Sequence, residues 1–239
     1  LAGGSFSLYY RAYIKGPAVI LRNAEFRTYL GIVLTAMLLI ALNLILSMGM
    51  DGDMAARVAV FQVTSLSTTG FVSADFETWP TFSKMVLLLL MVIGGCAGST
   101  ASGIKVARLI LLVRNARAVV LQKLNPNRVV DITLTGAHVD GAMLLRVGTF
   151  FFLYLAVIFV TAFLLAMDGL LPFDAVAVAI TTIGNIGPAF GIVSATSTYA
   201  PLSDFSKAIL CLTMLLGRLE IFTLLILLQP SFWRRTHRW

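Results

Sequence analysis

Two segments of the chain repeat one pattern in the same register. Residues 50–71 (MDGDMAARVAVFQVTSLSTTGF) and 167–188 (MDGLLPFDAVAVAITTIGNIGP) both begin with Met-Asp-Gly and pass through small and apolar residues to a glycine. The aspartates of the two copies lie 117 positions apart, and so do the glycines Gly70 and Gly187. This register indicates an internal duplication, so the fold must be one that two copies of this unit can build.

Both copies lie between long apolar runs. The chain is 59% hydrophobic and 12% charged, with a mean hydropathy of +0.92, which is typical of a bilayer protein. Four runs approach the roughly 20 apolar residues that a membrane-spanning helix needs. They cover residues 29–48, 82–97, 143–167 and 205–228. The stretches at 54–66 and 173–183 are too short to span, which predicts two re-entrant pore helices in an all-α integral membrane protein.

The net charge of +7 is unevenly distributed. Basic residues gather in three segments: before the first run, between the second and third runs, and at the end of the chain. Acidic residues gather in the two segments that contain the repeats. This positive-inside pattern predicts cytoplasmic basic segments and repeats that enter the membrane from outside. We therefore expect membrane lipid as the surroundings, and we do not expect a nucleic-acid partner.

Each short helix is followed by a glycine-containing segment suited to binding cations. A cation that crosses a membrane exchanges its hydration shell for oxygens, which backbone carbonyls of a non-helical segment can supply. Glycine allows the backbone angles that turn carbonyls toward a pore. The predicted ion-binding residues are Thr68, Thr69, Gly70 and Phe71 in the first copy and Gly184, Asn185, Ile186 and Gly187 in the second. An ordinary turn uses the same residue types, and the duplication favours the filter.

The block GGCAGSTASG, residues 94–103, interrupts the second apolar run. Each of its four glycines costs a helix about 1 kcal/mol relative to alanine, which predicts a break inside the membrane. Interrupted apolar segments are typical of ion paths in transporters. The alternative is close helix packing through small residues.

Arg218 and Glu220 lie within the last apolar run. Charges within hydrocarbon are expensive unless they are paired or face a polar cavity. Two residues apart on a helix, these side chains point in different directions, so each needs its own partner. For Arg218 we consider a role in permeation or gating, or a structural bond to carbonyls of the broken segment. Glu220 could also join the last span to the basic end of another helix.

The cysteines and histidines do not indicate catalysis. Cys96 and Cys211 lie in different apolar runs, and His138 and His237 lie in polar segments. None of them has metal-ligand spacing or the pattern of a nucleophile with its base. We therefore expect no enzyme and no bound cofactor.

The start of the chain predicts an incomplete span. Residues 1–10 (LAGGSFSLYY) would form about 15 Å of helix, half of what a membrane requires, before a basic segment. We interpret residues 1–27 as the end of a preceding membrane helix and a cytoplasmic connection. Residues 28–124 and 140–239 are then the two pore repeats, the second with a short cytoplasmic tail, and residues 125–139 are a cytoplasmic linker.

Three segments resemble a known family. They are TSLSTTGFVSADFETWP, GGCAGSTASGIKVARLILLVRNARAVVLQKLNPNRVV and LLGRLEIFTLLILLQPSFWR. They are similar to the C-terminal half of the membrane subunit of bacterial Trk potassium-uptake systems, in the Trk/Ktr/HKT superfamily. The resemblance implies a K⁺-channel-like architecture of four repeats around one pore. This chain resembles the third and fourth repeats, preceded by the end of the second.

The resemblance also implies a function and its residues. The expected function is K⁺ uptake across the bacterial cytoplasmic (inner) membrane, with K⁺ as the transported ion at the filter residues. An intramembrane loop below the filter and the arginine that faces it would form the gate. The implied gating residues are Gly94, Gly95, Gly98, Ser99, Thr100, Gly103, Lys105 and Arg218.

The implied partners are a second copy in a homodimer, a cytoplasmic nucleotide-binding regulatory (TrkA-like) subunit and the N-terminal repeats of the same protein. Three alternatives remain: a Na⁺-selective transporter of the same superfamily, a Na⁺-coupled one, and a non-conducting membrane scaffold or regulatory subunit. A scaffold should tolerate alanine at Gly70 and Gly187, whereas a carbonyl filter should not.

Overall fold

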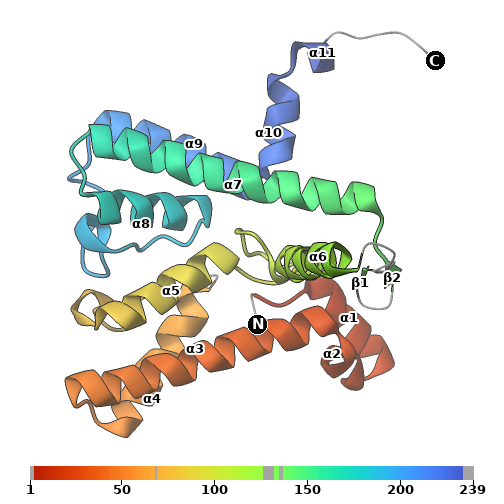
Figure 1. The fold of residues 1–239 in the computed structure, drawn as a ribbon. Helices are drawn as coiled ribbons and strands as arrows, with labels where there is room; N and C mark the ends of the chain where they lie inside the picture. The colour runs from red at the N-terminus through yellow and green to blue at the C-terminus, as the bar shows by residue number, and fades with distance from the viewer. Residues whose placement is uncertain (1–2, 68, 126–131, 135–136, 234–239) are drawn as a thin grey trace.

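The chain folds into two helical repeats that pack side by side (Figure 1). The computed structural model describes residues 3–67, 69–125, 132–134 and 137–233. The first repeat comprises α3 (Ala24–Met48), α4 (Gly52–Leu66), the short 3₁₀ turn η1 (Phe76–Thr78), α5 (Thr81–Ile93) and α6 (Val106–Leu124). The second comprises α7 (Gly141–Met167), α8 (Pro172–Ile183), the 3₁₀ turn η2 (Gly191–Val193), α9 (Asp204–Arg218) and α10 (Ile221–Leu228). Helices α1 (Phe6–Lys15) and α2 (Ala18–Arg22) precede them, and α11 (Pro230–Trp233) follows.

The duplication is visible in the helix boundaries. Helices α3 and α7 begin 117 residues apart, at Ala24 and Gly141. Helices α4 and α8 end 117 residues apart, at Leu66 and Ile183. Beyond this point the register is lost, because α5 and α9 begin 123 residues apart, at positions 81 and 204. The structural repeat therefore extends through the short helices and diverges after the segments that follow them.

Within the described residues, α3 and α7 are the two unbroken helices that are long and apolar enough to cross a membrane. They contain 25 and 27 residues, which correspond to lengths of about 37 and 40 Å. Helices α4 and α8 contain 15 and 12 residues and cannot span, which agrees with the two short helices predicted from the sequence. The side chain of Asp51 accepts a hydrogen bond from the backbone N–H of Asp53 and so caps the start of α4.

The predicted break in the second apolar run is confirmed, because α5 ends at Ile93 and the next helix begins at Val106. The prediction of one continuous span over residues 205–228 is wrong. Helix α9 ends at Arg218, α10 begins at Ile221, and the two axes differ in direction by 108°. Glu220 adopts a φ of +58°, and a residue in this left-handed region cannot continue a right-handed helix. The hydropathy of the run gave no sign of this bend.

The two repeats meet through α5 and α8, which lie next to each other in Figure 1. At this junction the rings of Phe76 and Phe190 pack edge to face with their centroids 5.2 Å apart. The Glu77 carboxylate accepts from the backbone N–H of Gly191 in the second repeat at 3.0 Å and pairs with Lys84 of the first at 2.6 Å. Apolar packing and a polar bond therefore both join the repeats.

The connection between the repeats contains a small hairpin. Strand β1 (Thr133–Leu134) pairs antiparallel with β2 (Ala137–His138). Residues 126–131 and 135–136 of the predicted linker, residues 125–139, lie outside the described residues. Within the described part, the linker is a short β-structure between two helices, and the fold is otherwise helical.

Candidate ion-conduction site

Each short helix leads into a segment that hydroxyl groups of its last turn hold in place. We call residues 67–71 and 184–188 the candidate filter segments. In the first, the Ser65 hydroxyl donates to the carbonyl of Phe71 at 2.5 Å. In the second, the Thr181 hydroxyl donates to the carbonyl of Pro188 at 2.8 Å. The two carbonyls belong to the residues that follow Gly70 and Gly187, so both repeats brace the equivalent carbonyl, although the donors, Ser65 and Thr181, lie 116 rather than 117 positions apart.

Backbone bonds add to this brace. The N–H groups of Thr69 and Gly70 both donate to the Ser65 carbonyl, at 2.7 and 2.9 Å. The N–H of Ile186 donates to the Thr181 carbonyl at 3.0 Å. Thr68, one of the predicted filter residues, lies outside the described residues. These bonds hold residues 69–71 and 186–188 against the ends of their helices.

The two candidate filter segments are in direct contact. Gly70 has a φ of +76°, and a Cβ atom at this position would lie 1.7 Å from the carbonyl oxygen of Ile186. Gly187 has a φ of +115° with open space around it, and its carbonyl accepts from the Tyr199 hydroxyl at 2.5 Å. Gly184, in contrast, has an ordinary helical φ of −73° as the residue that caps α8. The positive φ therefore explains why glycine occupies positions 70 and 187, but it does not explain the glycine at position 184.

The short helices also provide an electrostatic preference. Helices α4 and α8 both end where the candidate filter segments begin. The C-terminus of a helix carries the equivalent of roughly half a negative charge, because its last carbonyls have no partner within the helix. The C-terminal ends of both helices therefore make the region between the two candidate filter segments more favourable for a cation than for an anion.

The glycine-rich block forms a closed loop between α5 and α6. Its ends are joined where the N–H groups of Ile104 and Lys105 donate to the carbonyls of Val92 and Ile93, at 3.2 and 3.0 Å. A Cβ on Gly94 would lie 2.3 Å from the Ser102 carbonyl oxygen, and one on Gly103 would lie 3.3 Å from the Gly94 Cα. Gly94 and Gly103 therefore let the two limbs of a loop touch, which differs from the alternative of close helix packing through small residues.

The loop lies against the second candidate filter segment and α9. The Asn185 side-chain amide lies 3.4 Å from the Ser102 hydroxyl and donates to the Met214 carbonyl at 3.2 Å. On α9, a Cβ on Gly217 would lie 1.9 Å from the carbonyl oxygen of Ile183, the last residue of α8. Gly217 thus allows α9 to approach the end of α8, next to the second candidate filter segment, a role that the sequence reasoning missed.

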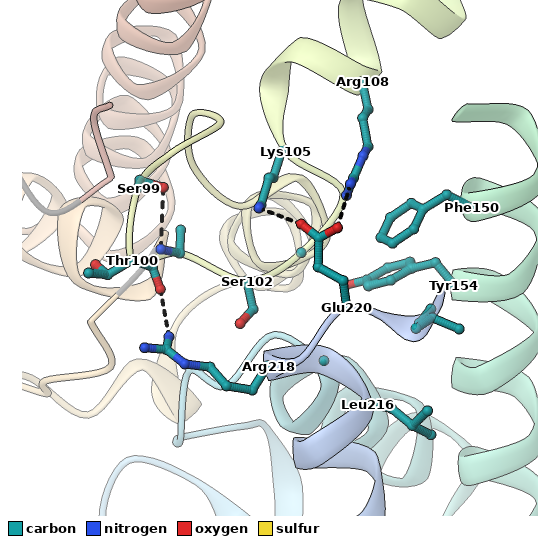
Figure 2. Close-up of a pocket in the computed structure, with 14 residues that line it drawn as sticks. Ser99, Thr100, Ser102, Lys105, Arg108, Phe150, Tyr154, Leu216, Arg218 and Glu220 are labelled. Carbon is teal, nitrogen blue, oxygen red and sulfur yellow. Dashed lines mark hydrogen bonds and ion pairs between the residues drawn. The ribbon is translucent and has the colours of Figure 1, made fainter. Parts of the chain in front are cut away.

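The loop, the break between α9 and α10, and α7 together line a cavity of about 340 Å³ (Figure 2). The Arg218 guanidinium donates to the Thr100 carbonyl at 2.9 Å. The Glu220 carboxylate accepts from Lys105 at 2.8 Å and from Arg108 at 2.9 Å. Three cationic side chains and one carboxylate therefore line this cavity, which gives it a net charge of +2 at neutral pH.

The separate partners expected for Arg218 and Glu220 are confirmed, and both belong to the loop or to the start of α6. Figure 2 shows the two side chains extending in different directions from the helix break. Arg108 was absent from the predicted site. It bonds to Glu220 and also stacks over the Phe150 ring, 3.9 Å from the ring centroid. Its position one turn after Lys105 was the available signal.

Backbone strain gathers at this site. Among the described residues, the non-glycine residues with positive φ are Lys105, Asn185 and Glu220, at +70°, +51° and +58°. Lys105 ends the loop, Asn185 belongs to the second candidate filter segment, and Glu220 forms the break between α9 and α10. Such residues cost of order 1–3 kcal/mol each and are typical of functional sites and switch regions.

Replacing Glu220 with glutamine should destabilise the junction between the loop and the helix break. Lys105, Arg108 and Glu220 are 19%, 22% and 41% exposed, so their charges are only partly solvated. A hydrogen bond to a charged group contributes about 1.5–3 kcal/mol, and partial exposure lowers the combined loss for the two bonds to about 3 kcal/mol. We expect a lower thermal unfolding midpoint for the purified complete protein in detergent.

Asp204→Asn is the control for this change, because it removes an exposed carboxylate that pairs with Lys207 at 3.5 Å. Surface pairs of this kind contribute little, so the midpoint of this variant should equal that of the wild type. A Glu220→Gln protein that unfolds at the wild-type temperature would show that the two ion pairs do not hold the junction.

Comparison with known proteins places these features in a family. The model of the family described as TrkH, cation transport protein, matches residues 18–235. The Trk system potassium uptake protein TrkH of Salmonella typhimurium is 37% identical over 215 residues, which cover 89% of this chain and 44% of that protein. The Trk system potassium uptake protein TrkG of Escherichia coli is 31% identical over 243 residues, 98% of this chain and 48% of that protein.

A solved structure agrees with the fold. The crystal structure of the potassium transporter TrkH from Vibrio parahaemolyticus matches with a TM-score of 0.88 at 35% sequence identity, over 96% of this chain and 50% of that one. The chain spans about half the length of the curated relatives it matches. Each repeat contains a short helix and ends in a broken apolar run, α5 and α6 in the first and α9 and α10 in the second. Because the family model matches nearly all of the sequence, the chain belongs to the TrkH family of cation transport proteins.

Proposed function

We propose that the protein containing this chain takes up potassium ions across the bacterial cytoplasmic membrane through a single pore of four repeats. The observation that carries the proposal is the contact of Gly70 with the Ile186 carbonyl, between the segments that follow the C-terminal ends of α4 and α8. Two backbone segments held there can offer carbonyl oxygens to a dehydrated cation. The relatives named as potassium uptake proteins support K⁺ as that cation.

The pore needs more than this chain. Two segments form two walls of a filter, and a cation in a carbonyl filter needs oxygens on all sides. In our proposal, upstream repeats of the same protein supply the other two walls. The isolated 239 residues should therefore not conduct as a monomer.

The loop and Arg218 form the proposed gate. The loop lies against the second candidate filter segment through Asn185 and Ser102, and Arg218 donates to the carbonyl of Thr100, two residues before Ser102. A guanidinium and a net charge of +2 next to the ion path oppose a cation that leaves the filter. Movement of the loop away from the ion path, with loss of its bond to Arg218, would open the path.

We further propose that the complete protein forms a homodimer and docks a cytoplasmic nucleotide-binding regulatory (TrkA-like) subunit. Helix α6 supports this docking, because it leads away from the loop and carries Arg114, Arg117 and Lys123. A subunit that binds this basic helix could move the loop, since Lys105 and Arg108 lie at the start of the same helix.

Uptake in bacteria that lack their own potassium uptake systems tests the proposed function. The chain joined to its upstream sequence should restore growth at low potassium and ⁸⁶Rb⁺ uptake that unlabelled K⁺ suppresses. Suppression by Na⁺ alone would favour a Na⁺-selective member, and uptake that requires Na⁺ would favour a Na⁺-coupled one. A protein that reaches normal membrane abundance but restores neither growth nor uptake would favour the scaffold alternative.

A further inference from the structure

The first limb of the loop, residues 95–98, is bonded to a part of the chain outside the proposed gate. The backbone N–H of Cys96 donates to the Gly3 carbonyl at 2.8 Å. The N–H of Phe6 donates to the Gly98 carbonyl at 3.1 Å. These bonds join the limb to the segment of residues 3–6, of which residues 3–5 are buried.

The approach between the limb and this segment is close enough to require glycine. A Cβ on Gly95 would lie 2.7 Å from the Gly3 carbonyl oxygen and 3.1 Å from the Gly3 Cα. A Cβ on Gly98 would lie 3.3 Å from the Ser5 hydroxyl. The two backbones therefore pack directly against each other, and the glycines serve this contact as well as the shape of the loop.

A charged group completes the attachment. Glu25, in the first turn of α3, accepts a hydrogen bond from the N–H of Ala97 at 2.5 Å. Hydrogen bonds from an amide to a carboxylate are shorter and roughly twice as strong as neutral ones. Backbone atoms of Cys96, Ala97 and Gly98 are thus all bound, either by residues 3–6 or by Glu25.

The second limb, residues 99–103, is joined to the first at its start, where the Ser99 backbone N–H and hydroxyl donate to the Cys96 carbonyl at 3.3 and 2.6 Å, and its further partners lie elsewhere. Its Thr100 carbonyl accepts from Arg218, and its Ser102 hydroxyl lies next to Asn185. Both partners belong to the second repeat. Gly98 and Gly103, with φ of +73° and +94°, lie at the junction of the limbs and at the end of the second limb. Glycine is the residue that best tolerates a change of backbone angle, so these positions are suited to act as hinges.

We propose that Glu25 and residues 3–6 are positioning residues of the gate. They fix the first limb, so that opening moves only the second limb between Gly98 and Gly103, away from Arg218. The proposal rests on the function proposed above. It assigns a role in gating to the segment that precedes the first complete repeat, and it gives the loop a fixed half and a moving half.

The test uses the complete protein in a form in which Cys96 is the only cysteine. This buried thiol reports on the first limb through its reaction rate with a water-soluble methanethiosulfonate reagent, and ⁸⁶Rb⁺ influx into liposomes reports on the gate. Glu25→Ala removes the acceptor. Glu25→Gln retains a carbonyl oxygen that can accept from Ala97. Asp53→Ala is the matched control, because it removes an exposed carboxylate whose side chain pairs with Arg57 on α4.

Losing one charge-assisted hydrogen bond should make Cys96 react roughly tenfold faster in Glu25→Ala and raise basal ⁸⁶Rb⁺ influx several-fold. The preference for Rb⁺ over Na⁺ should not change, because Glu25 bonds to the loop and not to a candidate filter segment. Glu25→Gln should restore most of both wild-type values, and Asp53→Ala should match the wild type. If Glu25→Ala does not accumulate, Gly95→Ala should give the same two changes, because its Cβ would lie 2.7 Å from the Gly3 carbonyl oxygen and 2.9 Å from the Ala101 Cβ and would push the first limb away from both.

Unchanged labelling and influx in both Glu25→Ala and Gly95→Ala would overturn the proposal. So would faster labelling with unchanged influx, because the attachment would then be structural without positioning the gate. A wild-type protein that takes up no Rb⁺ would instead contradict the proposed function, and the Cys96 rates would still report whether Glu25 holds the limb.

Discussion

Replacing Gly70 with alanine should abolish potassium uptake. The new Cβ would lie 1.7 Å from the Ile186 carbonyl oxygen, well inside van der Waals contact, so one of the two candidate filter segments must move. The φ of +76° adds a strain of about 1–2 kcal/mol for a residue with a side chain. We expect ⁸⁶Rb⁺ uptake by the complete protein to fall more than roughly tenfold at matched membrane abundance.

Two other glycines separate strain from steric clash in this experiment. Gly187 has a φ of +115°, and a Cβ there would have no neighbouring atom within 4 Å, so Gly187→Ala introduces strain alone and should reduce uptake less than Gly70→Ala. Gly16 has a φ of +93°, also in open space, in the connection between α1 and α2. Gly16→Ala should leave uptake unchanged. Near-normal uptake in Gly70→Ala would place the ion path elsewhere.

Replacing Arg218 with alanine should increase basal uptake. The variant removes a positive charge next to the path and the bond to the Thr100 carbonyl at 2.9 Å. Two unit charges roughly 8 Å apart repel by about 2 kcal/mol at an effective dielectric of about 20, which corresponds to roughly 30-fold in rate. We therefore expect initial ⁸⁶Rb⁺ influx into liposomes to rise by about an order of magnitude without regulatory subunits.

Arg218→Lys is the control that keeps the charge but loses the planar guanidinium. Its influx should lie between the wild type and Arg218→Ala, and closer to the wild type. Influx that falls in Arg218→Ala while the protein stays folded would show that the arginine supports the path. Equal influx in all three proteins would limit its role to a structural bond.

Several features of this molecule could be predicted from local sequence, because their causes are local. The short apolar runs predicted α4 and α8, and four glycines in ten residues predicted the break after Ile93. The cost of a charge in hydrocarbon predicted that Arg218 and Glu220 each have a partner. The length of an apolar run, helix propensity and the cost of desolvating a charge decide these features, and all three can be estimated from a short window of sequence.

The features that were missed depend on contacts between distant residues. Glu25 binds Ala97 across 72 positions, a contact that no local pattern indicated. The sequence allowed a bond from Glu220 to the basic end of another helix, but it did not identify Lys105, 115 positions away, as the partner. The bend between α9 and α10 was missed for the same reason, since Glu220 takes its left-handed conformation where it meets Lys105 and Arg108. A hydropathy window records that residues are apolar, and it carries no information about backbone direction. The glycine at position 217 likewise has its reason in Ile183 of another helix.

The most direct test of the central claim is ion competition in liposomes that contain the purified complete protein. Initial ⁸⁶Rb⁺ influx is measured against added K⁺ or Na⁺, for the wild type and for the double variant Gly70→Ala, Gly187→Ala. Our account predicts that K⁺ competes strongly and Na⁺ weakly in the wild type, and that influx disappears in the double variant while the protein remains folded. Equal competition by the two ions would contradict potassium selectivity, and unchanged influx in the double variant would contradict a filter formed by these two segments.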